Sequence, residues 1–454
     1  MKVSVGENIN GGNPLRERTQ LITSRFPTAM LDQIVFCMQN KIADLQILCV
    51  MSFDCQVDAE RMVKAVRLTL DAEPILGCRF VEHWWRPYWE RRNDLNRINT
   101  CRLVKVTDII QDLVHFMSTP IEPLTDPLVQ VRILRSETDT LCIKLNHMVA
   151  DGCGGKEYAY LLASIYRKLA DAPGYKPEPN LGGSRSLYQI SKHFGLLDKF
   201  RIIRRGFRDF RRRFLPRTSW SFPSTEGDLS KKVLVIRQFG PERFRAIKEY
   251  GRKHRATVND MILAAFYRAL FDVINPDPNV PLRLANTVDL RRYLPSGKTG
   301  VICNLSNFSF INIGRELGTT FDETIAKIRN DMNAMKADYL GLGDYPFAAL
   351  LFKGLPFSWS RRLFNQLLNR LTRTRNAPPL FTNTGIFDSE ELVFGEPTVT
   401  DAYIIAPTFF PPSFGMLLSS FRESLTLSTN FFETAIKRSS VERLLNQMEC
   451  ELPR

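Results

Sequence analysis

The strongest structural signal in this sequence is residues 141–152, which read LCIKLNHMVADG. The segment begins as an apolar strand over 141–146 and passes directly into His147. A preceding strand over 128–135 and a short polar turn complete a predicted β-hairpin. Because a helix is predicted after Gly155, His147 lies at the exit of a strand just before a helix, where rigid scaffolds commonly display catalytic side chains.

The residues around His147 suit proton transfer. The chain has five histidines, and only His147 sits at a strand exit with a carboxylate, Asp151, four residues later and Gly152 beside it. A neutral imidazole accepts a proton from a hydroxyl or amine near pH 7 when its other nitrogen is held as a donor. Asp151 could hold that nitrogen directly or fix the loop that aims the ring, and Gly152 permits a tight turn. A structural histidine in a packed loop is the alternative.

The length of 454 residues suggests two or three domains or one large two-lobed unit. Strand and helix patterns are mixed in each half, so we predict an α/β (α+β) fold with two lobes. We place a flexible N-terminal arm at 1–25, an N-terminal lobe at 26–175, a linker at 176–228 and a C-terminal lobe at 229–454.

Several classes of protein are disfavoured by what the sequence lacks. We find neither an apolar leader nor a run of about 18 apolar residues, so we expect neither a secretory signal nor a membrane-spanning helix. We also find no G-x-S-x-G elbow, no Walker loop and no zinc-ligand spacing, and we expect no metal site. The nine cysteines are odd in number and scattered, which indicates buried, reduced thiols in a cytoplasmic protein.

Five segments extend the signal around His147 over most of the chain. In order they read DPLVQVRIL, LCIKLNHMVADG, TVNDMILAAFYRAL, NTVDLRRYLP and LTLSTNFF. Together they resemble the acyltransferases of the chloramphenicol-acetyltransferase-like superfamily. That superfamily includes nonribosomal peptide condensation domains, alcohol acyltransferases, wax-ester synthases and polyketide-associated acyltransferases. The resemblance covers the chain from about residue 26 to residue 450 and does not select a subfamily.

The resemblance implies two similar lobes, arranged as a pseudo-dimer with a tunnel between them. His147 matches the general base that deprotonates the acceptor hydroxyl or amine. Asp151, followed by Gly152, matches a carboxylate that points away from substrate and pairs with an arginine of the second lobe. Our candidate for that arginine is Arg291, with Asp289 bracing the same turn. A thioester of coenzyme A or phosphopantetheine is the implied co-substrate, with no permanently bound cofactor and no acyl-enzyme.

The sequence departs from two subfamily patterns. Peptide condensation domains usually carry two consecutive histidines, but here the first position is Asn146, and the D-F-G-W-G loop of plant-type enzymes has no counterpart. Residues 381–385, FTNTG, resemble a stretch of stand-alone alcohol and polyketide-associated acyltransferases. That likeness implies a place for Asn383 in the tunnel lining, and a turn residue is the alternative. Asn304 and Asn307 are our candidates for an oxyanion donor.

Two segments hold most of the chain's net charge of +14: residues 196–217 with +7 and residues 353–375 with +6. Apolar residues recur at helical spacing in both, so each predicts a basic amphipathic helix. These apolar residues are Phe200, Ile203, Phe207, Phe210 and Phe214 in the first segment and Phe364, Leu367, Leu368 and Leu371 in the second. Three interpretations stay open: a peripheral membrane contact, a docking face for an acidic acyl-carrier protein or coenzyme A, and a solvated outer face. Nucleic-acid binding is disfavoured because no binding motif accompanies the charge.

Residues 84–89, WWRPYW, form an unusually dense aromatic run. Such a run predicts either a cluster in the core or at the seam between lobes, or the wall of an apolar ligand site. The sequence alone favours the first interpretation, because aromatic side chains most often pack in cores.

These observations predict an acyltransferase that moves an acyl group from a thioester donor, acyl-CoA or acyl-carrier protein, to an alcohol or amine. His147 is the predicted general base. Two alternatives stay open: amide-forming condensation on carrier-bound substrates, and a non-catalytic basic protein that keeps the fold and binds membranes or nucleic acid. We expect a cytoplasmic protein, with a peripheral position at the inner membrane face as an option raised by the basic segments.

Overall fold

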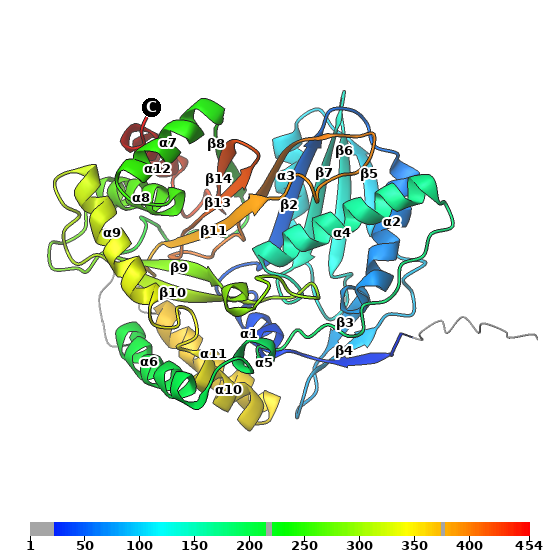
Figure 1. The fold of residues 1–454 in the computed structure, drawn as a ribbon, viewed down its shortest axis with the longest axis horizontal. Coiled ribbons are helices and arrows are strands. Elements are labelled where there is room, and N and C mark those ends of the chain that lie inside the picture. The colour runs from blue at the N-terminus through cyan, green and yellow to red at the C-terminus, as the bar shows by residue number, and fades with distance from the viewer. Residues whose placement is uncertain (1–21, 215–219, 374–376) are drawn as a thin grey trace, which may run out of the picture.

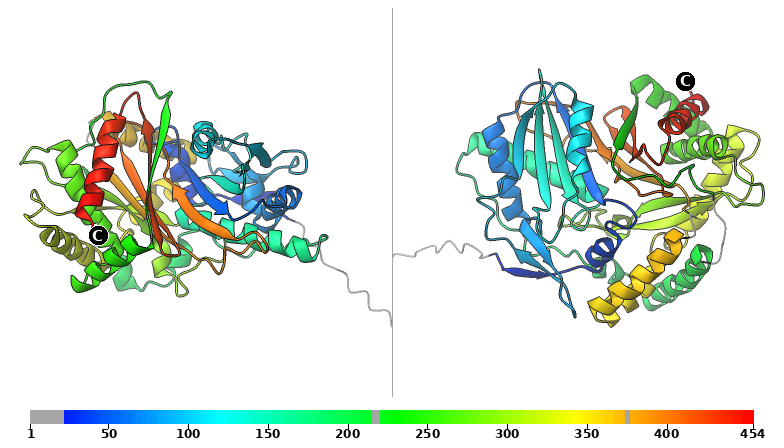
Figure 2. Two further views of the ribbon diagram at one scale, coloured as in Figure 1. Left: turned by 90° about the horizontal axis from the view of Figure 1, so that it is seen from above. Right: turned by 180° about the vertical axis from the view of Figure 1, so that it is seen from behind.

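The computed structural model describes residues 22–214, 220–373 and 377–454, and the predicted arm at 1–25 lies mostly outside these residues. Two lobes lie side by side, each built around a β-sheet (Figure 1). The N-terminal lobe is mainly blue to cyan and the C-terminal lobe mainly green to red, and the view from behind shows them side by side with an orange strand that reaches the N-terminal sheet (Figure 2). The predicted two-lobed α/β architecture is therefore confirmed.

The N-terminal lobe is built on a five-stranded sheet in the order β12-β2-β7-β6-β5. Its strands are β12 (Val399–Ile405), β2 (Gln46–Phe53), β7 (Asp139–Asn146), β6 (Val129–Arg135) and β5 (Cys101–Lys105). Strands β6 and β7 pair antiparallel from Val129–Leu145 to Arg135–Asp139, as the hairpin pattern predicts.

Helices cover both faces of this sheet, because successive side chains of a strand point to opposite sides. Ile47, Cys49 and Met51 of β2 face the main core, where α2 (Ala59–Ala72) and α4 (Gly152–Asp171) pack. Leu48 and Val50 face the other way and pack with α3 (Ile109–Ser118). The apolar residues of β2 are therefore buried on both faces of the sheet.

A small sheet in the order β1-β4-β3 carries the aromatic run. Its strands are β1 (Arg25–Pro27), β4 (Tyr88–Arg91) and β3 (Cys78–Val81). Trp89 is fully buried and its indole N–H donates to Asp32 Oδ2 at 2.8 Å. Trp84 and Trp85, in the loop between β3 and β4, are 65% and 46% exposed, so the core interpretation holds for Trp89 and not for these two.

The C-terminal lobe contains a six-stranded sheet in the order β10-β9-β11-β13-β14-β8. Its strands are β10 (Ser306–Asn312), β9 (Arg283–Asp289), β11 (Leu380–Phe387), β13 (Gly415–Phe421), β14 (Ser424–Phe432) and β8 (Lys232–Phe239). Its helices are α7 (Pro241–Lys253), α8 (Val258–Ile274), α9 (Phe321–Lys336) and α12 (Arg438–Glu451). Thr257 and Asp260 form a capping box that starts α8.

One strand of the segment 229–454, which we assigned to the C-terminal lobe, belongs to the N-terminal sheet. Strand β12 pairs antiparallel with β2 over Val399–Ile405 and forms the edge of the N-terminal sheet. The Ile404 backbone also reaches the other sheet: its N–H donates to Ser419 Oγ at 3.2 Å, and its C=O accepts from Ser428 Oγ at 2.9 Å. An apolar strand has no local feature that selects its sheet, so the sequence could not predict this exchange.

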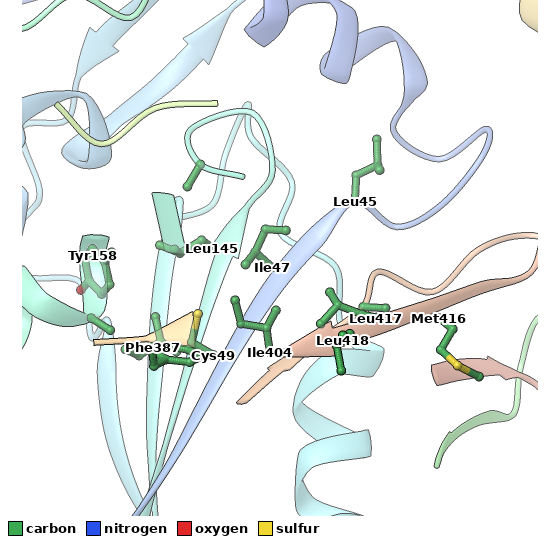
Figure 3. Packing of buried hydrophobic residues seen from close by; sticks show 14 of the residues in the cluster. Leu45, Ile47, Cys49, Leu145, Tyr158, Phe387, Ile404, Met416, Leu417 and Leu418 are labelled. Atoms are coloured by element: carbon green, nitrogen blue, oxygen red, sulfur yellow. The ribbon is translucent and has the colours of Figure 1, made fainter. Parts of the chain in front are cut away.

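The crossing strand joins the two cores into one. Ile404 lies between Ile47 and Cys49 of the N-terminal sheet and Leu417 and Leu418 of the C-terminal sheet (Figure 3). All five side chains are buried and belong to one continuous cluster. The lobes are therefore packed through a shared apolar seam.

The predicted linker at 176–228 contains helices. Helix α5 (Tyr188–Ser191) and the long α6 (Leu196–Phe214) lie within it. Helix α6 lies beside α10 (Tyr345–Gly354), which in turn contacts α11 (Phe357–Arg373) and α1 (Met30–Met38). These helices gather at one end of the molecule, below both sheets in Figure 1.

All nine cysteines are free thiols. Six are buried as predicted, Cys153 is partly exposed, and Cys55 and Cys450 are exposed, which corrects the expectation of uniform burial. Two short helices, η1 (Pro74–Gly77) and η2 (Leu290–Tyr293), complete the elements, and η2 contains Arg291.

Candidate functional site

His147 follows the last residue of β7 and is held by its neighbours. Its backbone N–H donates to the Leu45 C=O at 3.0 Å. Asn146, just before it, is buried and donates from Nδ2 to Gln39 Oε1 and to the Ile121 C=O. Asn146 therefore braces the strand end, at the position where condensation domains carry their first histidine.

The ring of His147 lies in a low-polarity environment next to one amide. Burial lowers the pKa of His147 below its ordinary value of 6.5, and a hydrogen bond with its own backbone and the charge of Asp151 offset this only in part. Nδ1 lies 3.3 Å from Asn304 Nδ2, which also donates to the His147 C=O at 3.2 Å. The imidazole is therefore neutral near pH 7, the state that a general base requires.

The orientation of the Asn304 amide is fixed by its oxygen. Asn304 Oδ1 accepts from the backbone N–H of Ser306 at 3.1 Å and from its hydroxyl at 3.0 Å. The amide nitrogen therefore faces His147, and a residue of the second lobe contacts the histidine of the first. Asn304 is the only one of the three candidate asparagines with a hydrogen bond to His147 among the described residues.

The other two asparagines bind elsewhere. Asn307 Nδ2 donates to the Gly341 C=O at 2.7 Å, and Asn383 Nδ2 donates to Asn259 Oδ1 at 3.0 Å. Asn383 Oδ1 accepts from the Gly385 N–H, where Gly385 has a φ of +73° beside an irregularity in β11. Asn383 thus makes the turn contact that was the alternative interpretation.

Asp151 fixes the loop that carries His147. It is the N-cap of α4 and its Oδ1 accepts from the Gly154 N–H at 2.8 Å. Its Oδ2 accepts from the Leu305 N–H at 2.7 Å and from Arg291 Nη1 at 2.9 Å. Helix α4 therefore starts at Gly152, four residues earlier than the sequence pattern predicts, because Asp151 caps it.

Arg291 is the centre of a buried ionic cluster between the lobes. Its guanidinium contacts Asp151 at 2.9 Å, Glu157 at 3.2 Å and Asp289 at 3.3 Å, and it donates to the Cys303 C=O at 3.0 Å. The structure thus brings together Asp151, Asp289 and Arg291, the three charged residues selected from the sequence. Asp289 also accepts from the Arg291 N–H at 2.9 Å as the N-cap of η2.

The charges in this cluster are balanced by burial and pairing. Burial alone would raise the pKa of Asp151, but Arg291 and the two backbone donors outweigh it and hold the pKa below its ordinary value. Burial alone would lower the pKa of Arg291, but Asp151 and Glu157 raise it. Burial raises the pKa of Glu157, and Arg291 opposes this only in part. Asp151 and Arg291 are therefore charged near neutral pH.

Gly152 sits where another side chain leaves no room. A Cβ on Gly152 would lie 2.5 Å from Thr384 Cγ2, a methyl group of β11. A Cβ on Gly154 would lie 2.7 Å from the Cys303 C=O. The glycines after Asp151 therefore allow α4 to pack closely against the second lobe. The backbone of Gly152 itself does not require a positive φ.

Sequence reasoning missed Arg185, which binds the residues that follow His147. Its guanidinium donates to the Met148 C=O at 3.1 Å and the Val149 C=O at 3.0 Å. It also pairs with Asp32 at 2.9 Å and donates to the Ile302 C=O at 2.6 Å. Arg185 lies in a segment of glycine and serine with no periodicity, so no sequence signal marks it.

Two cavities of the described residues lie away from His147. A polar one of about 320 Å³ is lined by residues of α4 and the loop after β11, including Tyr160, Arg167 and Asp388. An apolar one of about 270 Å³ lies between α5, α6 and residues 342–346. Neither has His147 in its lining, so the tunnel stays a prediction.

Two further searches concern the described part of the chain. No cluster of three or more His, Cys, Asp or Glu side chains there is arranged to hold a metal ion. No helix there combines the length and apolarity needed to cross a membrane.

The comparisons with known proteins identify the fold. No family model and no curated protein matches the chain. Among solved structures, it is similar to trichothecene 15-O-acetyltransferase from Fusarium sporotrichioides, with a TM-score of 0.68 and 13% identity over 94% of each chain. It is similar to the first condensation domain of the CDA synthetase, with a TM-score of 0.65 and 14% identity over 93% of this chain and 94% of that one.

A third similar structure is polyketide synthase associated protein 5 from Mycobacterium tuberculosis. The TM-score is 0.62 and the identity 15%, over 93% of this chain and 98% of that chain. The chain therefore has the two-lobed fold of the chloramphenicol-acetyltransferase-like acyltransferases and condensation domains, as the sequence resemblance predicts. The likeness extends over nearly the whole length of both chains, so both lobes of the fold are present.

Proposed function

We propose that the chain is an acyltransferase that transfers an acyl group from a thioester to an alcohol or amine, with His147 as general base. The observation that carries this proposal is a neutral histidine at the junction of the lobes. Its loop is anchored by Asp151–Arg291 on one side and by Arg185 on the other. The similarity to an O-acetyltransferase and to a condensation domain supports it.

The proposed reaction needs one proton carrier. In the proposed tautomer Nδ1 carries the ring hydrogen and interacts with the backbone of His147, so Nε2 is free to accept the proton of the acceptor hydroxyl or amine. The oxygen or nitrogen attacks the thioester carbonyl, and the tetrahedral intermediate collapses with loss of the thiolate. Protonated His147 then returns its proton to the thiolate, which gives an ester or amide and a free thiol. The enzyme itself stays unmodified.

Asn304 is a positioning residue in this proposal. Its amide nitrogen donates to the His147 carbonyl, which supports a role in holding the backbone that carries the ring rather than in binding the oxyanion. The donor is a thioester of coenzyme A or of a phosphopantetheine carrier protein, as the resemblance implies.

The test is a substrate panel with paired variants. Acyl-CoAs and acylated carrier proteins are offered with alcohols and amines, and turnover is compared for wild type, His147→Ala and the control His193→Ala, which removes an exposed imidazole. We expect His147→Ala to lose about 10²–10⁴-fold in kcat, the range typical of general-base catalysis, while His193→Ala stays near wild type. Equal turnover by His147→Ala would contradict the proposal.

A further inference from the structure

Helix α6 presents an apolar side to solvent. Leu196, Phe200, Ile203 and Phe207 are spaced by four, three and four residues, so they form one stripe along the helix. Their exposed fractions are 86%, 66%, 43% and 58%. Leu197, in the first turn, is 75% exposed. Monomeric soluble proteins rarely leave several large apolar side chains together in water, so this surface requires an explanation.

The opposite side of α6 packs against the protein. Ile202, Arg205 and Gly206 are buried. Arg205 pairs with Asp209 at 2.9 Å and donates to the Met335 C=O at 3.1 Å. A Cβ on Gly206 would lie 2.4 Å from the Gly343 C=O, so the helix backbone approaches that loop closely. The helix is therefore attached mainly through its arginine and glycine side, and the side chains of the apolar stripe stay largely exposed.

Basic side chains flank the apolar stripe. Arg201 and Arg204 are exposed on one flank and Lys199 on the other. Arg208 is also exposed and pairs with Asp338. We define the α6 surface as the apolar residues Leu196, Leu197, Phe200, Ile203 and Phe207 with the basic residues Lys199, Arg201 and Arg204. The side chains of residues 210–219 lie outside the described residues and are not part of this definition.

Exposed apolar residues continue on the neighbouring elements. Leu350 of α10 is 72% exposed and Trp359 of α11 is 63% exposed. Trp84 is linked to the start of α11, because its C=O accepts from the Ser358 N–H at 3.1 Å. Helices α6, α10 and α11 lie together at one end of the molecule (Figure 1), and Phe207 contacts Phe347 of α10 with ring centroids 5.2 Å apart.

The two basic segments differ in how they pack. In α11 the predicted apolar residues Phe364, Leu367 and Leu368 are partly or fully buried, and Arg362 and Arg370 face solvent. That arrangement is an ordinary amphipathic helix with a charged outer side. In α6 the described members of the predicted apolar set, Phe200, Ile203 and Phe207, are exposed instead. The solvated-face interpretation therefore suits α11 and does not explain α6.

From these observations we infer that the α6 surface docks on a membrane that contains anionic lipid. A basic helix with outward aromatic residues inserts its apolar side between headgroups while its arginines bind lipid phosphates. The apolar cavity of about 270 Å³ beside α6, lined by Ile203 and Lys199, adds apolar surface next to the stripe. An acidic carrier protein would be bound by the charges alone and would leave Phe200 and Phe207 in water.

The experiment measures binding of the full chain to vesicles. Sedimentation is carried out with phosphatidylcholine vesicles with and without phosphatidylglycerol. We compare wild type with Phe200→Ser/Phe207→Ser, with Arg201→Gln/Arg204→Gln, and with the control Val63→Ser, which alters an exposed apolar residue of α2. Thermal melting establishes that each variant is folded.

Wild type and Val63→Ser are expected to bind the anionic vesicles equally. The double phenylalanine variant should bind at least roughly tenfold more weakly, and the arginine variant should lose the preference for phosphatidylglycerol. Unchanged binding by a folded double phenylalanine variant would overturn the inference. It would also be overturned if the wild type ignored vesicles and bound an acidic acyl-carrier protein with the same arginines. Acyl transfer to water-soluble acceptors is measured separately, so failure here leaves the proposed function standing.

Discussion

At the residue scale, the Asp151 carboxylate makes two contacts that stabilise the structure. It caps α4 through the Gly154 N–H and holds Arg291 of the other lobe, so one carboxylate connects the His147 loop to both lobes. The motif around His147 and the arginine-rich turn near 291 could be selected from the sequence because their residue types match the superfamily. Glu157 and Arg185 could not, because their roles depend on contacts across the fold and not on local spacing.

Removing Arg291 is expected to be much more damaging than removing its neighbour. Arg291→Ala leaves Asp151 buried without its cation, which costs about 3–5 kcal/mol of unfolding free energy. Arg292→Ala removes an exposed side chain and serves as the control. The measurement is urea denaturation. A difference between the two variants below about 1 kcal/mol would contradict this account of the cluster.

Glu73 makes the stability of the protein depend on pH. Burial raises the pKa of Glu73 from 4.5 to about 7, although a hydrogen bond from Asn180 and the charge of Arg185 lower it in part. The folded protein thus binds more protons than the unfolded chain between these values, so the contribution of Glu73 to stability is lost as pH rises from 4.5 to about 7.

The variant Glu73→Gln removes this titration and keeps a polar group beside Asn180. Relative to Glu73→Gln, the wild type should lose on the order of 2 kcal/mol of unfolding free energy across that pH range. Glu60→Gln, which alters an exposed carboxylate of the same helix, is the control. Urea denaturation at several pH values measures how the unfolding free energy changes with pH. If that free energy changed equally with pH in wild type and Glu73→Gln, burial would not raise the pKa of Glu73.

At the element scale, the contact between α4 and β11 sets how closely the lobes approach. The hairpin of β6 and β7 and the basic helices α6 and α11 could be predicted from the sequence, since apolar periodicity is a local signal. The start of α4 was missed because its glycine-rich first turn has low helix propensity and depends on the Asp151 cap. The outward stripe of α6 was unpredictable, because periodicity defines a helix side without saying which side packs.

The close contact between Gly152 and Thr384 can be tested by a double-mutant cycle. Gly152→Ala places a methyl group 2.5 Å from Thr384 Cγ2, and overpacking of this kind costs about 1–3 kcal/mol. Thr384→Ser removes that methyl group, so the cost of Gly152→Ala should fall in its presence. Gly240→Ala, at a helix start with open space around it, is the control. Additive effects in urea denaturation would show that the two sites do not touch.

At the scale of the whole molecule, the two lobes share one core and one exchanged strand. Strand β12 completes the N-terminal sheet, and Ile404 packs between both sheets (Figure 3). The two-lobed fold itself was predictable from the ordered set of segments. The exchange of β12 was not, because it depends on which sheet edge is free in three dimensions.

We expect the lobes to unfold as one unit. Hydrogen exchange measured on peptides from β2 in the N-terminal sheet and β13 in the C-terminal sheet should give the same opening free energy, because neither core is complete alone. Urea unfolding followed by far- and near-ultraviolet circular dichroism should show coincident transitions. Two separated transitions, with β2 and β13 exchanging independently, would contradict a shared core.

The position of β12 in the sequence also determines when the N-terminal sheet can be completed during synthesis on the ribosome. Strand β2 is made early, but the partner for its free edge lies some 350 residues later in the sequence. Until that partner emerges, the nascent N-terminal sheet has an open, apolar edge of the kind that recruits other chains. The first large sheet of this protein is therefore completed only after most of the chain has been made, and a chain halted before residue 399 is an aggregation hazard.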